Sequence, residues 1–166
     1  MAAEMRSGSQ PCPVECVGMA VSCPPVRFRK ERTLTSQREE FRVAGLGEPI
    51  SHYTDAVRHG DLLFISGCGP FDEENRIVGG DDAAQQCRQV LKNIDKILVA
   101  ANASFADVLK VTVYLTDVGD RTVINPVRKE FFGQTRPAST LIGVAALAFP
   151  EMKVEIDAVA ALGGSP

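Results

Sequence analysis

The sequence predicts one α+β domain within residues 46–166, in which a mixed sheet is covered on one face by two helices. Two segments carry apolar residues three and four positions apart, the period of a helix with one buried face. Several shorter segments are alternating or continuous apolar runs bounded by turn residues, which is typical of strands. The expected order is strand, strand, helix, strand, helix, strand and strand.

The first two strands are expected to form a hairpin. Residues 61–66 are a short apolar run that a turn at residues 67–70 ends, as in a buried strand. Residues 53–57 are expected to pair with it across the turn at residues 58–60. A further turn at Gly79 and Gly80 leads to Asp81, a residue type that favours the N-cap of a helix.

The helix that follows has the clearest pattern in the chain. Apolar or small residues recur along one stripe of about six turns, and polar residues lie outside it. Because Cys87 lies on the stripe, it is expected to be a core residue. The members of the stripe are Ala84, Cys87, Leu91, Ile94, Leu98 and Ala101.

Four more elements complete the domain. Residues 107–117 alternate as a strand, and residues 120–132 are a second helix with Pro126 in its first turns. Residues 139–147 and 152–162 are two further strands, the last with strict alternation. Since two helices cover only one face of such a sheet, a second subunit is the natural cover for the other face.

Composition favours a protein that acts on a small molecule. The chain carries a net charge of −3 and has two Tyr and no Trp, so it lacks the basic surface and stacking side chains typical of nucleic-acid binding. No apolar run approaches the ~20 residues that span a bilayer, and the first residues resemble neither a secretory signal nor a mitochondrial presequence. We therefore expect a cytoplasmic protein with no membrane partner, for which nucleic acid is disfavoured.

Residues 1–45 are expected to be a flexible extension, because prolines and mixed charges interrupt any periodicity there. Three of the five cysteines, Cys12, Cys16 and Cys23, lie in it. Their spacing suggests a zinc knuckle, but no fourth ligand lies nearby, so no metal site is expected. An odd number of cysteines without an export signal indicates free thiols. Near the second strand, Cys68 is interpreted as an inert loop residue rather than a reactive thiol.

Six segments, taken in order and spacing, resemble the RidA family (reactive intermediate deaminase, YjgF-type, also labelled L-PSP endoribonuclease). The resemblance implies a chorismate-mutase-like fold assembled as a homotrimer, with small clefts at the subunit interfaces. It also implies hydrolysis of enamines and imines to a keto acid and ammonium, without a cofactor or metal. The segments are residues 60–67, 85–101, 108–117, 125–132, 136–140 and 153–159.

The resemblance extends to site residues. The site tyrosine, serine and asparagine of the family match Tyr53, Ser66 and Asn125, and the acidic residue of the final strand matches Glu155. Tyr53 and Glu155 are expected to be catalytic, and Ser66 and Asn125 to bind the substrate. Structural roles stay open: Tyr53 as a cap on the sheet, Ser66 in a turn, Asn125 at a helix end. Glu155 is favoured, because a buried carboxylate needs a partner or a role.

One position departs from the family. Deaminating members read Pro-Ala-Arg-Ser where this chain reads Pro-Ala-Ser-Thr, so Ser139 replaces the arginine that holds the substrate carboxylate. Arg136 can replace that cation only if the backbone turns at Pro137, because an odd offset along a strand points to the opposite face. Arg128 is a second candidate. Ser139 and Thr140 are expected to bind a neutral or differently shaped ligand.

Two functions therefore remain open. The first is hydrolytic deamination of an enamine or imine with an altered substrate, since one lost bidentate contact weakens binding by roughly 1.5 to 3 kcal/mol. The alternative is a non-catalytic RidA-like trimer that binds a small molecule or a partner. Entry of Arg136 into the cleft would favour the first. Ribonuclease activity, which some family members are labelled with, is disfavoured by the acidic composition.

Overall fold

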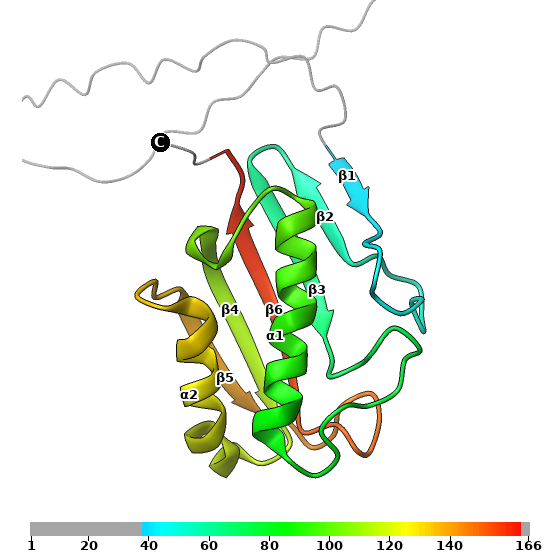
Figure 1. The fold of residues 1–166 in the computed structure, drawn as a ribbon, viewed down its shortest axis with the longest axis vertical. Coiled ribbons are helices and arrows are strands. Elements are labelled where there is room, and N and C mark those ends of the chain that lie inside the picture. Colours follow the sequence, from blue (N-terminus) through cyan, green and yellow to red (C-terminus); the bar gives the residue numbers. More distant parts are fainter. Residues whose placement is uncertain (1–37, 164–166) are drawn as a thin grey trace, which may run out of the picture. The chain divides into compact units, whose positions relative to one another are not determined.

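The computed structural model describes residues 38–163, which form a six-stranded sheet with two α-helices packed on it (Figure 1). The predicted α+β class, with two helices on a mixed sheet, is confirmed. Two short 3-10 helices, η1 (Phe105–Asp107) and η2 (Val118–Asp120), precede β4 and α2. The other elements are β1 (Arg38–Phe41), β2 (Ala56–His59), β3 (Leu62–Cys68), α1 (Ala83–Ala100), β4 (Val108–Leu115), α2 (Arg121–Phe132), β5 (Ala138–Gly143) and β6 (Val154–Ala161).

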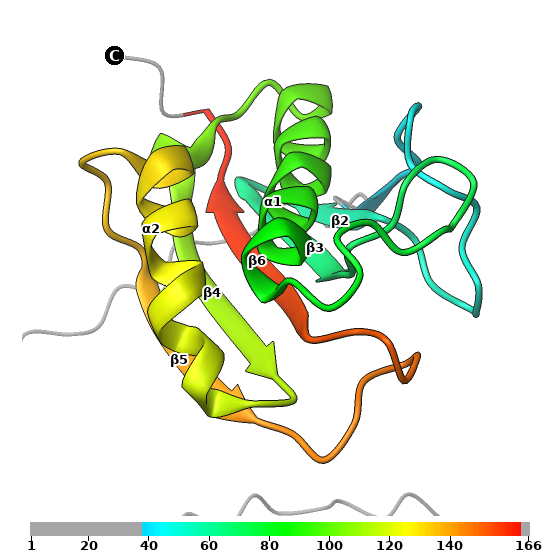
Figure 2. The same cartoon turned by 60° about the horizontal axis from the view of Figure 1, so that its bottom comes forward.

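The strands lie in the order β1-β2-β3-β6-β4-β5. Every neighbouring pair is antiparallel except β4 and β5, which run parallel and are joined through α2. A parallel pair needs such a crossover, because the chain must return to the same end of the sheet. The last strand in the sequence, β6, therefore lies in the middle of the sheet (Figure 2).

Both α-helices lie on the same face of the sheet, where α1 packs against α2, β3 and β6 (Figures 1 and 2). The predicted alternation is confirmed in the two central strands: Val111, Val113 and Leu115 of β4 are buried beneath the helices, as are Val154 and Ile156 of β6. Residues between them point to the opposite face, called here the open face, which no helix of the described chain covers.

The helix α1 follows its predicted stripe, and Cys87 is fully buried as expected. Its N-cap is Asp82 and not Asp81, which corrects the prediction. The side chain of Asp82 accepts from the backbone N–H groups of Ala84 and Gln85 at 2.8 and 3.1 Å. Asp82 takes this position because its own N–H closes the preceding turn on the carbonyl of Gly79, at 2.9 Å. Among residues 38–163, no helix is long and apolar enough to cross a membrane.

A buried amide attaches the start of α1 to the segment that leads into β6. Gln86 is fully buried, and its Nε2 donates to the carbonyls of Gly80 and Glu151 at 2.6 and 2.8 Å. Its Oε1 accepts from the N–H of Lys153 at 2.7 Å. These bonds satisfy backbone groups that burial would otherwise leave unpaired, so they hold the entry to β6 in place.

The end of the predicted extension departs from expectation, since residues 38–41 form β1 and pair with β2. This strand could not be predicted from the sequence, because Arg-Glu-Glu-Phe has no alternation of apolar and polar residues. Such a polar sequence is suited to an edge strand that is exposed to solvent. Residues 42–45 of the predicted extension also belong to the folded domain, with Val43 buried in its core. Residues 1–37, including Cys12, Cys16 and Cys23, lie outside the described residues.

Two other strands are shorter than predicted. The expected strand at residues 139–147 ends at Gly143, because its parallel partner β4 ends at Leu115. One last hydrogen bond, from the N–H of Val144 to the carbonyl of Leu115 at 2.9 Å, closes that pairing. The first strand of the hairpin begins at Ala56 instead of Tyr53, which leaves Tyr53 in the preceding loop. Pro126 lies in the second turn of α2.

Candidate functional site

The strand β3 contains an irregularity at its end that shapes the first candidate region. Ile65 pairs with Ala158 and Cys68 pairs with Ile156, so two residues of β3 lie opposite one residue of β6. The extra residue makes a β-bulge, a feature that bends a strand and re-aims its side chains. Ser66 and Gly67 are the two bulged residues, which corrects the prediction that the glycine begins a turn.

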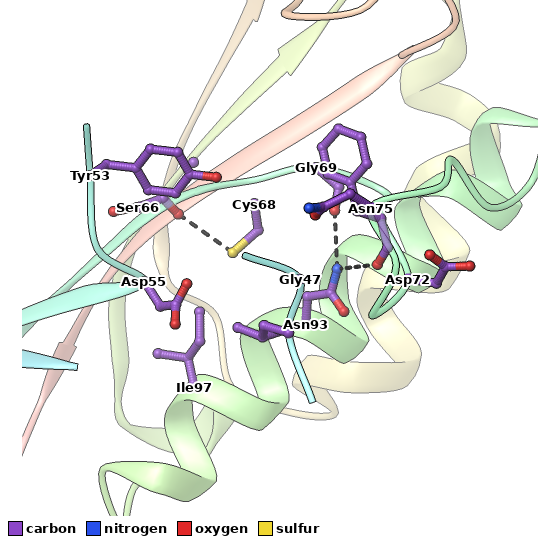
Figure 3. A pocket seen from close by; sticks show the side chains of 13 residues that line it. Gly47, Tyr53, Asp55, Ser66, Cys68, Gly69, Asp72, Asn75, Asn93 and Ile97 are labelled. Carbon is purple, nitrogen blue, oxygen red and sulfur yellow. Dashed lines mark hydrogen bonds between the residues drawn. The ribbon is translucent and has the colours of Figure 1, made fainter. Parts of the chain in front are cut away.

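A cavity of about 60 Å³ lies beside this bulge (Figure 3). Tyr53 and Ser66 lie at one end of it, and Asp72 and Asn75 lie at the other. The structure thus brings together two residues that the sequence analysis proposed for one site. The full lining is Leu46, Gly47, Tyr53, Asp55, Ser66, Gly67, Cys68, Gly69, Phe71, Asp72, Asn75, Asn93 and Ile97.

Ser66 has a structural role, and it also retains acceptor capacity. Its hydroxyl donates to the carbonyl of Thr54 at 2.6 Å, and its N–H donates to the carbonyl of Asp55 at 3.0 Å. Because the hydroxyl proton is used in this way, only the oxygen lone pairs can meet a ligand. The side chain of Tyr53 is 47% exposed. Within residues 38–163 its hydroxyl has no hydrogen-bond partner, so it can both donate and accept.

Two buried polar residues that were not predicted as site residues hold the walls of the cavity. The carboxylate of Asp55 accepts from Arg42 Nη1 at 2.6 Å and from the N–H of Val43 at 2.8 Å. From the middle of α1, Asn93 Nδ2 donates to the carbonyls of Gly69 and Phe71 at 3.2 and 2.9 Å. Both are satisfied within the fold, which favours structural roles. The only signal for Asn93 in the sequence is that an amide occupies a position on the buried side of the predicted helix.

Glu155 is half-buried on the open face and does not line the cavity, but its carboxylate lies against Gly67, which does. A Cβ at position 67 would come within 2.2 Å of Glu155 Oε1. Burial, and secondarily the neighbouring Asp157 carboxylate, raise the pKa of Glu155 above its ordinary value. Asp157 accepts a hydrogen bond from the Tyr114 hydroxyl at 2.8 Å. In the described part of the chain, no group donates a hydrogen bond to the Glu155 carboxylate.

Cys68 is buried beside the same bulge. Burial, followed by the charges of Asp55, Glu155 and Asp157, raises its pKa to about 12, so the thiol stays protonated at neutral pH. The interpretation of Cys68 as unreactive agrees with this environment, but the residue ends strand β3 and does not lie in a loop. No group of three or more His, Cys, Asp or Glu side chains within residues 38–163 is arranged to hold a metal ion.

Two of the remaining predicted residues, Asn125 and Arg136, lie in a second region, between α2 and the start of β5. A pocket of about 550 Å³ there contains Asn125 and Arg136, together with Arg128. Because β5 starts only at Ala138, Arg136 precedes the strand, and the argument from strand alternation does not apply to it. The pocket is lined by Asn125, Arg128, Lys129, Phe132, Gly133, Gln134, Thr135, Arg136 and Pro137.

The two hydroxyl residues of β5 point to opposite faces of the sheet. Ser139 lies on the helix face, where its Oγ accepts from Arg128 Nη2 at 3.0 Å. Thr140 lies on the open face, where its Oγ1 accepts from Lys110 Nζ at 2.7 Å. A single ligand bound within one chain therefore cannot contact both side chains from the same side of the strand.

The predicted site residues thus form two separate groups in one chain. Tyr53, Ser66 and Glu155 lie near the bulge in β3, and the others lie around α2 and β5. Strands β6 and β4 separate β3 from β5. With neighbouring strands ~4.8 Å apart, β3 lies about 14 Å from β5 across the sheet, and β6, which carries Glu155, lies about 10 Å from β5.

Comparison with known proteins is consistent across sequence and structure. Residues 46–162 match the family model described as Endoribonuclease L-PSP. The chain is 42% identical to a RutC family protein of Pyrococcus horikoshii, over 68% of this chain and 89% of that protein. It is 37% identical to a protein of Acinetobacter baylyi named 3-aminoacrylate deaminase RutC, over 70% of this chain and 91% of that protein.

Solved structures give the same result. The crystal structure of RidA from an Antarctic Psychrobacter species superimposes with a TM-score of 0.70 at 32% identity, covering 75% of this chain and 99% of that one. The structure of the YjgF gene product of E. coli superimposes with a TM-score of 0.69 at 29% identity, covering 74% of this chain and 98% of that one.

Proposed function

The chain belongs to the endoribonuclease L-PSP family, which includes RidA and RutC proteins, and we propose that it hydrolyses reactive enamines or imines to a carbonyl compound and ammonium. One relative carries the name of a deaminase that acts on 3-aminoacrylate, itself an enamine. The observation that carries the proposal is the half-buried Glu155 carboxylate, held against Gly67 with a raised pKa.

Hydrolysis of an enamine or imine consumes one water molecule and needs a side chain that accepts and returns a proton. An enamine first takes a proton on carbon and becomes an imine. Water then adds to the imine carbon while a proton passes to nitrogen, and the C–N bond breaks as the C=O bond forms and ammonia leaves. Glu155 suits the transfer, because a carboxylate whose pKa is raised is a stronger base than an ordinary one and can accept a proton from water and return it to the leaving nitrogen.

The residues of the cavity suit the remaining tasks. The Ser66 hydroxyl donates to Thr54, so its oxygen is left to accept an N–H of the imine. The Tyr53 hydroxyl, which has no partner in the described chain, can hydrogen-bond the substrate or the attacking water. Both act by orienting the imine carbon toward the Glu155 side of the bulge.

We also propose that the protein assembles as a homotrimer and that each site is shared between two copies. The open face exposes Phe64 and, beside it on β3, Leu62. Because the two groups of site residues are far apart in one chain, a neighbouring copy is the simplest source of the missing half. Assembly would also complete the burial of Glu155, whose pKa is already raised.

The test is a coupled assay of 2-iminobutanoate hydrolysis. A threonine dehydratase generates the imine, and semicarbazide traps what remains. We expect the wild-type chain to accelerate hydrolysis, and Glu155→Gln, which keeps the shape and removes the charge, to lose the acceleration by at least about 100-fold, the scale of general acid–base catalysis. Glu151→Gln, an exposed carboxylate just before β6, is the matched control and should keep full activity.

The outcomes separate the two functions that the sequence left open. Loss of activity in Glu155→Gln alone supports the deaminase. A wild-type rate equal to that without protein rejects hydrolysis of this substrate. If such a protein still binds the corresponding keto acid, the alternative of a non-catalytic small-molecule-binding protein is favoured.

A further inference from the structure

The pocket between α2 and β5 has an unusual charge. Three of its lining side chains are cations, Arg128, Lys129 and Arg136, and none is a carboxylate. The chain as a whole has a net charge of −3, so the positive charge of this pocket is a local feature. A concave site lined by cations without acidic partners attracts anions.

Arg128 has the most constrained environment of the three. Burial lowers the pKa of its guanidinium below the ordinary value, although the nearby Cys87 opposes that shift. Its Nη2 donates to Ser139, while its Nε is buried and has no acceptor among residues 38–163. A neighbouring acid, Glu130, is occupied by Arg88 at 2.6 and 3.1 Å. Among residues 38–163, Arg128 is therefore a partly buried cation without a counter-ion, an arrangement that a bound anion would compensate.

Arg136 differs from Arg128 in this respect. It is exposed, it lies in the turn before β5, and it makes no hydrogen bond or ion pair within the described chain. Fixing such a side chain on a ligand requires its rotamer freedom to be lost on binding. The guanidinium of Arg128 is already held by the packing of α2 and by the Ser139 hydroxyl. Arg128 can therefore bind an anion at a smaller entropic cost.

We propose that Arg128 binds the carboxylate of a 2-imino or 2-oxo acid and that Ser139 positions its guanidinium. Ser139 uses one of the five N–H donors, so a planar fork remains for a bidentate contact with a carboxylate. The inference rests on the proposed function, and it assigns the contact with the substrate carboxylate in that function to Arg128. Ser139 thus belongs to the binding site as a positioning residue, not as a direct contact with a neutral ligand.

The test measures binding of 2-oxobutanoate, which does not react, to the full chain by isothermal titration calorimetry. We expect Arg128→Ala to weaken binding by about 10 to 100-fold. Arg128→Lys should recover little of it, because an ammonium has no planar fork. Arg136→Ala should weaken binding less than about threefold. Arg121→Ala, an exposed arginine on the same helix outside the pocket, should have no effect. The uncharged methyl ester should bind poorly to every variant.

A double variant distinguishes the loss of the Arg128 cation from a general disturbance of the fold. Ser139 lies 3.0 Å from the Arg128 guanidinium, so an arginine rooted at position 139 can place its own guanidinium nearby. Arg128→Ala combined with Ser139→Arg should therefore recover at least about tenfold in affinity over Arg128→Ala. Recovery supports the proposal, and failure of a folded double variant to recover counts against it.

The proposal for Arg128 and the deaminase proposal can be rejected independently of each other. If 2-oxobutanoate binds in an Arg128-dependent way while 2-iminobutanoate is not hydrolysed, Arg128 is the carboxylate anchor and the deaminase proposal fails. If hydrolysis persists with an unchanged KM in Arg128→Ala, the deaminase stands and the role of Arg128 is rejected. An equal loss of affinity in Arg136→Ala and Arg128→Ala, or undetectable binding to the wild-type chain, also rejects it.

Discussion

Glu155 and Gly67 act as a pair, because each limits what the other position can hold. The carboxylate occupies the space that any side chain at position 67 would need. The bulge in β3 brings the glycine there, so one extra residue in a strand decides where an acid on another strand can lie. The same contact keeps the carboxylate partly away from water, and this burial raises its pKa.

The raised pKa of Glu155 predicts a pH-dependent stability. The folded state holds the Glu155 proton more tightly than the unfolded state, so ionising this group destabilises the fold. That cost is absent below the unfolded pKa of about 4.3 and is complete once the pH exceeds the raised value. Glu155→Gln should therefore raise the melting temperature at pH 8 and change it little at pH 4.

Thermal unfolding followed by circular dichroism at the two pH values measures this difference. A Glu155→Gln variant that melts below the wild type at pH 8 would show that the ionised carboxylate makes stabilising contacts, contrary to the expectation. Glu151→Gln serves again as the control, because its side chain is exposed.

The candidate site residues could be proposed from the sequence one at a time, but their grouping could not. Tyr53 and Ser66 meet in one cavity because the loop before β2 folds over the bulge, which no local pattern encodes. Likewise, the contact of Arg128 with Ser139 depends on how α2 packs on β5. The sequence shows that the family arginine is absent and offers Arg128 as a candidate cation, whereas the contact between Arg128 and Ser139 appears only in three dimensions.

Among the elements, the strength of the periodic signal decided how well each was predicted. The strands β4 and β6 alternate strictly because one face of each is buried, so their limits lie within two residues of the prediction. By contrast, β1 is polar and lies at an edge, so it has no such pattern. The apolar run after Gly143 resembles a strand but has no partner left to pair with, since β4 has ended.

The two aspartates before α1 provide a test at this scale. Asp82→Ala should lower the free energy of unfolding by about 1 kcal/mol, because two N–H groups of the first turn lose their acceptor. Asp81→Ala should change it by less than about 0.5 kcal/mol, since its contact with Lys153 is an exposed ion pair at 3.5 Å. Urea unfolding measures both values, and equal losses would mean that the helix begins one residue earlier.

At the scale of the whole molecule, the open face is the surface of the sheet that the described part of one chain leaves uncovered. Phe64 is 47% exposed there and lies beside Val159 and Val57 on the neighbouring strands. Apolar side chains in adjacent rows are commonly covered by another subunit. The two separated groups of site residues lead to the same expectation, since a shared site needs a second copy.

Phe64→Asp should therefore dissociate the proposed trimer, because three copies would each bury a charge in the interface. The mass in solution, measured by size-exclusion chromatography with light scattering, should fall to that of a single chain, and hydrolysis should be lost with it. Val99→Asp changes an apolar residue that is 64% exposed on α1, outside the open face, and should leave the mass unchanged. A Phe64→Asp variant with the wild-type mass would place the interface elsewhere.

The central position of β6 also has a consequence for how the protein is made. A ribosome delivers β1, β2 and β3 first, then β4 and β5, and the strand that joins these two parts last. Until then each part presents an unpaired strand edge, β3 on one side and β4 on the other. A chain that stops before Val154 cannot close its sheet and lacks Glu155. Translation must therefore reach the final strand before the sheet can close, and chains that end earlier expose unpaired strand edges to proteases and chaperones.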